Sequence, residues 1–258
     1  MTSSPASDHV DLAVLGTVVR VCLDEPADRP AVEDPWHLCV LPPGGPEIPS
    51  SRVVRLPATE DDRSRGWALT SLTQEVTRAA ITEQTGRLVM FHAGALSSLE
   101  TGATVAYVAP GGTGKTTITT TLGPGRGYLT DETVAVTPSG AVKPYPKPLS
   151  VRQAGMGKDE VPPRSLGLQP AGAEPWLAAL LVVRRDPEHV GGPRVSRPGL
   201  LDGIVALSPE ISSLAALSTP LLTLRGLVER VGGVLQVTYR EAHQLEEILA
   251  EGLGRART

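Results

Sequence analysis

The 258-residue chain is poor in aromatic residues, cysteine and lysine. Aromatics make up 3% of it, with Phe91 as the one phenylalanine, so the core must be built from Val, Leu, Ile and Ala. Cys22 and Cys39 belong to no C-x-x-C pair, which argues against a disulfide scaffold and against a zinc site. Lysines are few, so each one is a candidate for a specific role: Lys115, Lys143, Lys147 and Lys158.

The charge balance and the hydropathy pattern exclude two classes of partner. Lys and Arg total 24 against 28 Asp and Glu, a formal net charge of −4, so the chain has no basic excess for coating nucleic acid. No apolar run approaches the length of a membrane span, and the first residues lack the basic and apolar parts of a signal peptide. We therefore expect a soluble, cytoplasmic protein with no nucleic-acid or membrane partner.

The order of patterns predicts an α/β protein with a small β-rich N-terminal region. We expect a flexible tail over 1–10, a β-rich region with a bridging helix over 11–86, and a nucleotide-binding domain over 87–258. Extended segments and helices alternate after residue 87, which favours an α/β class. The expected strands are 11–23, 36–41, 52–56, 88–91, 104–108, 133–136, 177–183 and 233–239; helices are expected over 63–86, after the loop at 109–116, from Ser208-Pro209, from Thr219-Pro220 and around 245–249; and 154–175 is expected to be a mobile loop.

The segment 109–116 fits the relaxed phosphate-loop pattern, with Ala109 in place of the usual first glycine. Its glycines allow backbone N–H groups to curl around a phosphate without side-chain clash. Lys115 brings a cation to the outer phosphates at a helix start, and Thr116 offers a hydroxyl to Mg²⁺. The pattern predicts binding of ATP and Mg²⁺ by Pro110, Gly111, Gly112, Thr113, Gly114, Lys115, Thr116 and Thr117.

Two further features flank this loop in the sequence. Asp131-Glu132 follows a short apolar segment, and a carboxylate there can hold Mg²⁺ through water or accept a proton from an attacking hydroxyl. The alternative is an Asp-Glu turn between two strands. His92 ends the strand before the loop, where a lone histidine is more often structural. If it hydrogen-bonds the acidic pair, we expect the pKa of His92 to be raised.

Three stretches together resemble the catalytic domain of the HPr kinase/phosphorylase family. They are Phe91-His92-Ala93-Gly94-Ala95, then Val105-Ala106-Tyr107-Val108-Ala109-Pro110 with its glycine-rich loop, and Tyr128-Leu129-Thr130-Asp131-Glu132. The resemblance covers about 88–152. It implies a P-loop domain of the HPr kinase/PEP carboxykinase-like type, and an ATP-dependent kinase that phosphorylates a hydroxyl.

The resemblance also implies roles for single residues. Lys115 would bind the β-phosphate region, Thr116 and Asp131 would hold the metal, and Glu132 would be the base, with His92 beside them. The family has Asp-Asp where this chain has Asp131-Glu132, so the role of base could pass to Asp131. HPr kinases are multimers, which makes a homo-oligomer an expectation here.

The downstream segment differs from the family as well. The chain has Pro144-Tyr145-Pro146-Lys147-Pro148-Leu149-Ser150-Val151-Arg152 where HPr kinases have a glycine-rich substrate segment. It looks more like shorter relatives that act on free serine or on peptides. The resemblance therefore implies an acceptor that is a small molecule, a peptide or a protein. The alternative is a nucleotide-binding accessory or regulatory ATPase. Candidates for a charge-neutralising arginine are Arg152, Arg184, Arg185 and Arg225.

Overall fold

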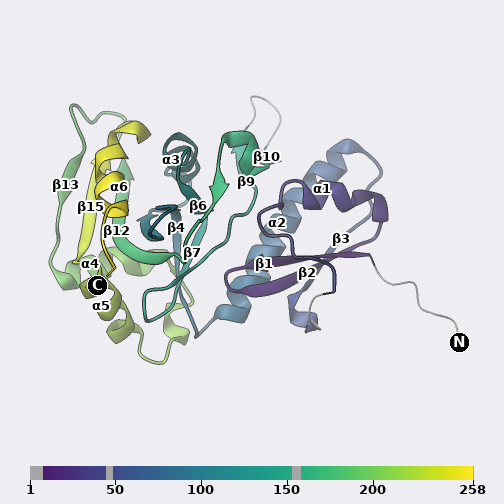
Figure 1. The fold of residues 1–258 in the computed structure, drawn as a ribbon, viewed down its shortest axis with the longest axis horizontal. Helices are drawn as coiled ribbons and strands as arrows, with labels where there is room; N and C mark the ends of the chain where they lie inside the picture. The colour runs from purple at the N-terminus through teal and green to yellow at the C-terminus, as the bar shows by residue number, and fades with distance from the viewer. Residues whose placement is uncertain (1–7, 45–48, 153–157, 258) are drawn as a thin grey trace, which may run out of the picture. The chain divides into compact units, whose positions relative to one another are not determined.

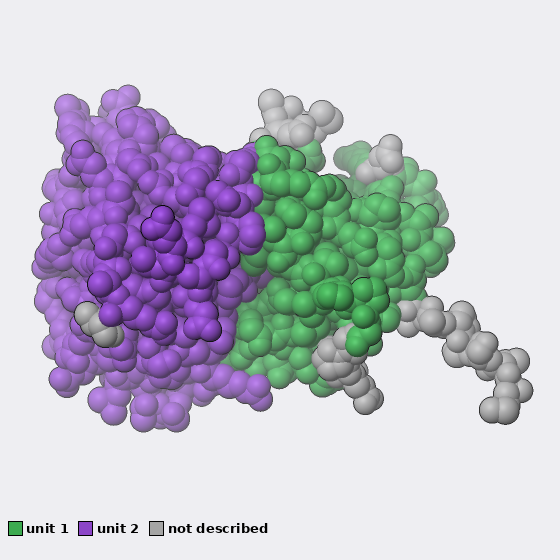
Figure 2. Space-filling view, in the orientation of Figure 1, with its two compact units in different colours: residues 1–84, 146–165 green, residues 85–145, 166–258 purple. Residues whose placement is uncertain are grey.

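The computed structural model describes residues 8–44, 49–152 and 158–257 of a mixed α/β protein with a large mixed sheet and a small N-terminal sheet (Figure 1). Two compact units divide the chain (Figure 2). Unit 1 comprises residues 1–84 and 146–165, and unit 2 comprises residues 85–145 and 166–258. The sequence analysis had assigned 146–165 to the nucleotide-binding domain, whereas these residues pack with the N-terminal region. Among the described helices, none is long and apolar enough to cross a membrane.

Unit 1 is built on a three-stranded sheet in the order β1-β2-β3. β1 (His9–Val14) and β2 (Thr17–Leu23) form an antiparallel hairpin, and β3 (Val53–Leu56) runs parallel to β2. Helix α2 (Asp62–Gln84) packs against β2 and β3, with its buried face formed by Leu72, Val76 and Ala80. The short helix α1 (Arg29–Glu33) packs against β1, and 3₁₀ turns occupy Pro26–Asp28 and Ser50–Arg52.

Two predicted strands of this region are corrected. The single strand expected over 11–23 is a hairpin, because Leu15 and Gly16 turn the chain with positive φ angles of 50° and 77°. The strand expected over 36–41 is a series of tight turns with one isolated bridge. There the amide of Cys39 donates to the carbonyl of Trp36 at 2.7 Å. Apolar residues at 36 and 39 are buried, but a turn rather than a strand buries them.

A second hairpin completes unit 1 from a distant part of the sequence. β9 (Leu149–Arg152) and β10 (Lys158–Val161) pair antiparallel, and a 3₁₀ turn follows at Pro163–Leu166. The Glu160 carboxylate accepts hydrogen bonds from Ser150 Oγ at 2.7 Å and from Thr73 Oγ1 of α2 at 3.2 Å. The loop expected over 154–175 is therefore partly wrong, since it includes strand β10; its residues 154–157 lie outside the described part.

Unit 2 contains a mixed sheet of ten strands, counted over the described residues. Its main path is β11-β6-β4-β5-β12-β15-β13, while β7 and β14 pair with β4, and β8 pairs with β7. β5, β12 and β15 are parallel, and β4 is antiparallel to β5. The strands are β4 (Val89–Ser97), β5 (Ala103–Val108), β6 (Gly127–Thr130), β7 (Thr133–Val136), β8 (Val142–Lys143), β11 (Gln169–Pro170), β12 (Trp176–Arg185), β13 (Arg194–Ser196), β14 (Ile211–Ser212) and β15 (Val234–Tyr239).

The helices of unit 2 are α3 (Lys115–Leu122), α4 (Leu200–Leu207), α5 (Pro220–Arg230) and α6 (Glu246–Leu253). Helix α6 packs against β5 and β12, and α4 packs against α5 and β15. The helix predicted from Thr219-Pro220 is confirmed as α5. The one predicted from Ser208 is wrong, because Ser208–Glu210 is a single 3₁₀ turn that leads into β14. Further 3₁₀ turns lie at Leu214–Ala216 and Ala242–Leu245.

Candidate functional site

The glycine-rich loop joins β5 to α3, in the strand–loop–helix context that the phosphate-loop pattern requires. Gly112 and Gly114 have φ angles of 79° and 95°, a left-handed conformation that glycine adopts at little cost. Thr113 Oγ1 donates to the carbonyl of Pro110 at 2.8 Å, closing the turn. The first N–H groups of a helix have no intrahelical acceptor, so the start of α3 is suited to bind an anion. Pro110, Gly111, Gly112 and Thr117 are exposed.

Lys115 is folded back onto this loop. Its Nζ donates to the carbonyls of Ala109 at 2.6 Å and Pro110 at 3.2 Å, and the residue is 6% exposed. Burial lowers the pKa of Lys115 to about 8, against the opposing influence of nearby carboxylates. A buried ammonium group that donates to neutral carbonyls would form stronger, charge-assisted hydrogen bonds with an anion bound at the loop.

The loop is joined directly to the acidic pair. Thr116 Oγ1 donates to Asp131 Oδ2 at 2.7 Å, and the Tyr128 hydroxyl donates to Asp131 Oδ1 at 3.4 Å. The pair forms the turn between β6 and β7, where Thr130 Oγ1 accepts hydrogen bonds from the amides of Glu132 at 3.1 Å and Thr133 at 3.3 Å. A turn between two strands and a site residue are thus compatible, since this turn brings the Asp131 carboxylate within hydrogen-bond distance of α3.

Strand β4 changes its partners at His92, which places that residue among four strand ends. Residues 93–97 pair with β5, and 95–97 pair with β6, whereas 89–92 pair with β7 and 90–91 with β14. The amide of Ala93 donates to the carbonyl of Glu132 at 3.0 Å. A Cβ atom built on Gly111 would lie 4.0 Å from His92 Nε2, so the imidazole borders the loop.

The electrostatics of His92 differ from the prediction. Burial, followed by the charge of Lys115, lowers the pKa of His92, although the Glu210 and Glu132 carboxylates oppose that shift. The expected rise is therefore wrong, because loss of solvent and a neighbouring cation outweigh the acidic pair. The strand pairing and the distance to Gly111 place His92 between the loop and the Asp131-Glu132 turn.

Glu210 is a site residue that the sequence analysis missed. Ile211 of β14 pairs with Phe91, so the preceding Glu210 comes level with His92. Its negative charge opposes the fall that burial causes in the pKa of both His92 and Lys115. No local motif could have found it, because its position depends on pairing between segments far apart in the sequence.

Oxygen ligands for Mg²⁺ are present in the Thr116 hydroxyl and the Asp131 carboxylate. In the described part of the chain, no group of three or more His, Cys, Asp or Glu residues is arranged to hold a metal ion. Mg²⁺ binds proteins through one or two carboxylates together with water and substrate phosphates, so Asp131 and Thr116 are the residues that could hold it.

The arginine candidates are separated by their contacts. Arg225 pairs with Glu229 at 2.9 Å, and Arg185 Nε donates to the carbonyl of Arg240 at 3.0 Å. Arg184 is exposed, two residues beyond the Val182–Val108 pair, at the edge of the sheet where the loop begins. The side chain of Arg152 lies outside the described part. Arg184 therefore has the best position of the candidates in unit 2.

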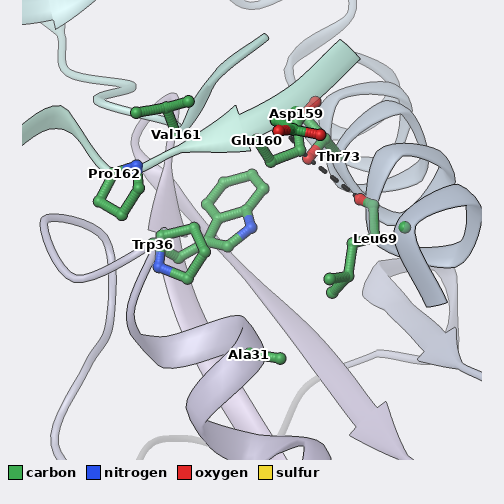
Figure 3. A pocket seen from close by; sticks show the side chains of 10 residues that line it. Ala31, Trp36, Leu69, Thr73, Asp159, Glu160, Val161 and Pro162 are labelled. Atoms are coloured by element: carbon green, nitrogen blue, oxygen red, sulfur yellow. Dashed lines mark hydrogen bonds between the residues drawn. The ribbon is translucent and has the colours of Figure 1, made fainter. Parts of the chain in front are cut away.

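Unit 1 has a separate cavity of about 340 Å³ (Figure 3). Trp36 and Leu69 line it together with Thr73, Asp159 and Glu160, and none of the predicted site residues does so. The predicted loop residues, His92 and the acidic pair all lie in unit 2, whereas the arginine candidate Arg152 belongs to unit 1. No family model matches this chain, and no curated protein is found to be similar to it.

Proposed function

We propose that unit 2 is a P-loop domain of the HPr kinase/PEP carboxykinase-like type that transfers the γ-phosphoryl group of ATP to a hydroxyl. The acceptor would be a small molecule, a peptide or a protein. The observation that carries this proposal is the 2.7 Å hydrogen bond from Thr116 to Asp131. It joins the first turn of α3 to the acidic pair, as a shared Mg²⁺ site would require.

Nucleotide binding is supported by three groups that suit a triphosphate. The loop glycines leave room for a phosphate against the backbone, Lys115 supplies a cation, and Thr116 with Asp131 supplies oxygen ligands. On binding, Lys115 would exchange the carbonyls of Ala109 and Pro110 for phosphate oxygens, a stronger charge-assisted pairing. Mg²⁺ would neutralise charge on the phosphates.

Transfer needs a base beyond the phosphates, and Glu132 fits that role by its place next to Asp131. In the proposed step, the acceptor oxygen forms a bond to the γ-phosphorus while the bond to the β,γ-bridging oxygen breaks. The proton of the acceptor hydroxyl passes to the Glu132 carboxylate, and ADP leaves with the electron pair. Arg184 is our candidate for neutralising charge in the transition state.

A second candidate function is a nucleotide-binding accessory or regulatory ATPase. The Asp131-Glu132 pair favours it, because glutamate places its carboxylate one methylene farther from the backbone than the aspartate of HPr kinases. The segment 144–152 favours it too, because it lacks the glycine-rich sequence of those enzymes. In this case ATP would be bound or hydrolysed with no phosphorylated acceptor.

The test measures unfolding and transfer on the same preparation. MgATP at about 100 times its dissociation constant should stabilise unit 2 by about 2.7 kcal/mol, which is about 5–10 °C in melting temperature for a domain of this size. Labelled ATP is then supplied with metabolite and peptide fractions. A phosphorylated product supports the kinase, ADP without one supports the ATPase, and no thermal shift with any nucleoside triphosphate rejects both.

A further inference from the structure

Glu210 lies beside the start of the glycine-rich loop. On one side of β4, β5 ends with Val108 opposite Ala93, and β14 begins with Ile211 opposite Phe91. Ala109 and Glu210 are therefore the residues that meet at His92 on this side, and the amide of Ala109 faces the His92 carbonyl at 3.4 Å. Lys115 Nζ donates to the Ala109 carbonyl, so the Glu210 charge is near that lysine as well and raises its pKa against the effect of burial.

The acidic pair lies on the other side of the same strand. Thr133 pairs with His92, and the carbonyl of Glu132 bonds the next amide of β4. Neighbouring strands lie about 4.8 Å apart, so the backbones of Glu210 and Glu132 are about 10 Å apart across β4. His92 stands between two carboxylates, one near the proposed base position and one near the loop.

This arrangement leaves one carboxylate without a role in binding ATP. In the proposed function Asp131 serves the metal and Glu132 the proton, whereas Glu210 lies beside the start of the loop at Ala109, whose carbonyl accepts a hydrogen bond from Lys115. A carboxylate there repels the phosphates, and Lys115 would be engaged by them. Several arginines of unit 2 have partners away from Glu210: Arg126 with Glu246, Arg225 with Glu229, Arg185 and Arg240 with Glu241, and Arg255 with the carbonyls of Ala178 and Val231.

Resting on the proposed kinase function, we infer that Glu210 selects the acceptor, and that the acceptor carries an ammonium or guanidinium group within about 10 Å of its reactive hydroxyl. The hydroxyl would lie toward Glu132 and the positive charge toward Glu210, on the two sides of His92. Such a cation offsets the excess negative charge of three carboxylates and a triphosphate. A neutral or anionic acceptor of equal size leaves this negative charge uncompensated.

The test compares acceptors that differ only in charge. One set is an amino alcohol, a diol and a hydroxy acid of equal chain length, and a second set is capped Ser-Lys, Ser-Gln and Ser-Glu dipeptides. Binding to the MgADP-loaded protein and transfer from labelled ATP are both measured. Because a hydrogen bond to a charged group contributes about 1.5–3 kcal/mol, the cationic member of at least one set should be favoured by about ten- to a hundredfold.

Glu210→Gln should abolish this preference by raising KM or Kd for the cationic member alone. Glu229→Gln, which removes a carboxylate from the exposed face of α5, is the matched control and should leave the preference intact. Removing the Glu210 charge should also strengthen MgATP binding, a result that a merely structural residue would not give. Equal binding of the three members by the wild type, or an unchanged preference in Glu210→Gln, overturns the inference. Absence of MgATP binding would instead overturn the proposed function.

Discussion

Replacement of Lys115 by methionine should stabilise the free protein and remove its response to ATP. The lysine is buried, and its two described hydrogen bonds go to the carbonyls of Ala109 and Pro110. A fall in the pKa of Lys115 from 10.5 to about 8 corresponds to about 3 kcal/mol of unfavourable charge burial. Loss of the two hydrogen bonds offsets about half of this. Methionine keeps most of the apolar stem, so Lys115→Met should gain about 1–2 kcal/mol at pH 7.

The gain should appear as a rise of about 2–8 °C in the melting temperature of unit 2 without nucleotide. The same variant should lose most of the MgATP-induced shift, because methionine supplies no cation to the phosphates. Lys143→Met, at a half-buried lysine of β8, is the control and should keep that shift. A free protein less stable than the wild type would refute the charge-burial argument. A full MgATP shift in Lys115→Met would refute the role of the lysine in binding.

The remaining predictions concern the acidic pair, His92 and unit 1. Glu132→Gln should keep MgATP binding but lower transfer by about 10²–10⁴-fold, whereas Asp131→Asn should also weaken the Mg²⁺ dependence; full transfer by Glu132→Gln would contradict the assignment of the base. His92→Ala should lower turnover per folded molecule more than nucleotide affinity, and a lower melting temperature with unchanged turnover would make His92 structural. In unit 1, Arg20 donates to both Asp11 oxygens, at 2.7 and 2.8 Å, and holds the pKa of Asp11 below its usual 3.8. The stabilisation from this pair is therefore complete above pH 3.8 and is lost as the pH falls through the lowered pKa of Asp11. Asp11→Asn should destabilise unit 1 by about 1–3 kcal/mol at pH 7. Unfolding measured at acid pH should show a smaller difference between the variant and the wild type.

Local patterns predicted the loop and its neighbours because each depends on adjacent residues. The glycines of 111–114 and the helix after them follow from backbone preferences within a few residues, and the Asp131-Glu132 turn follows from the two short strands around it. Glu210 could not be predicted, since its place depends on Ile211 pairing with Phe91. The hairpin of β9 and β10 could not be assigned to unit 1 for a similar reason, since its contact with Thr73 of α2 joins segments far apart in the sequence.

The reversed charge balance at His92 has the same origin. Burial is the main cause of the lowered pKa of His92 and the charge of Lys115 is the second, and both depend on how β4 packs in the fold rather than on the residues next to His92 in the sequence. The strand predicted over 36–41 was wrong for a different reason. The apolar run that follows His37 fits a strand, but buried side chains can also be presented by successive turns.

The return of residues 146–165 to unit 1 makes the order of synthesis matter for folding. When residue 84 has left the ribosome, the N-terminal sheet and α2 exist, but the hairpin that bonds Thr73 through Glu160 has not been made. Unit 1 can be completed only after the whole of the glycine-rich loop, α3 and the acidic turn has been synthesised. Unit 2 in turn must wait for β15 and α6. The two units therefore mature in an interleaved order, and no single cut in the gene separates one from the other.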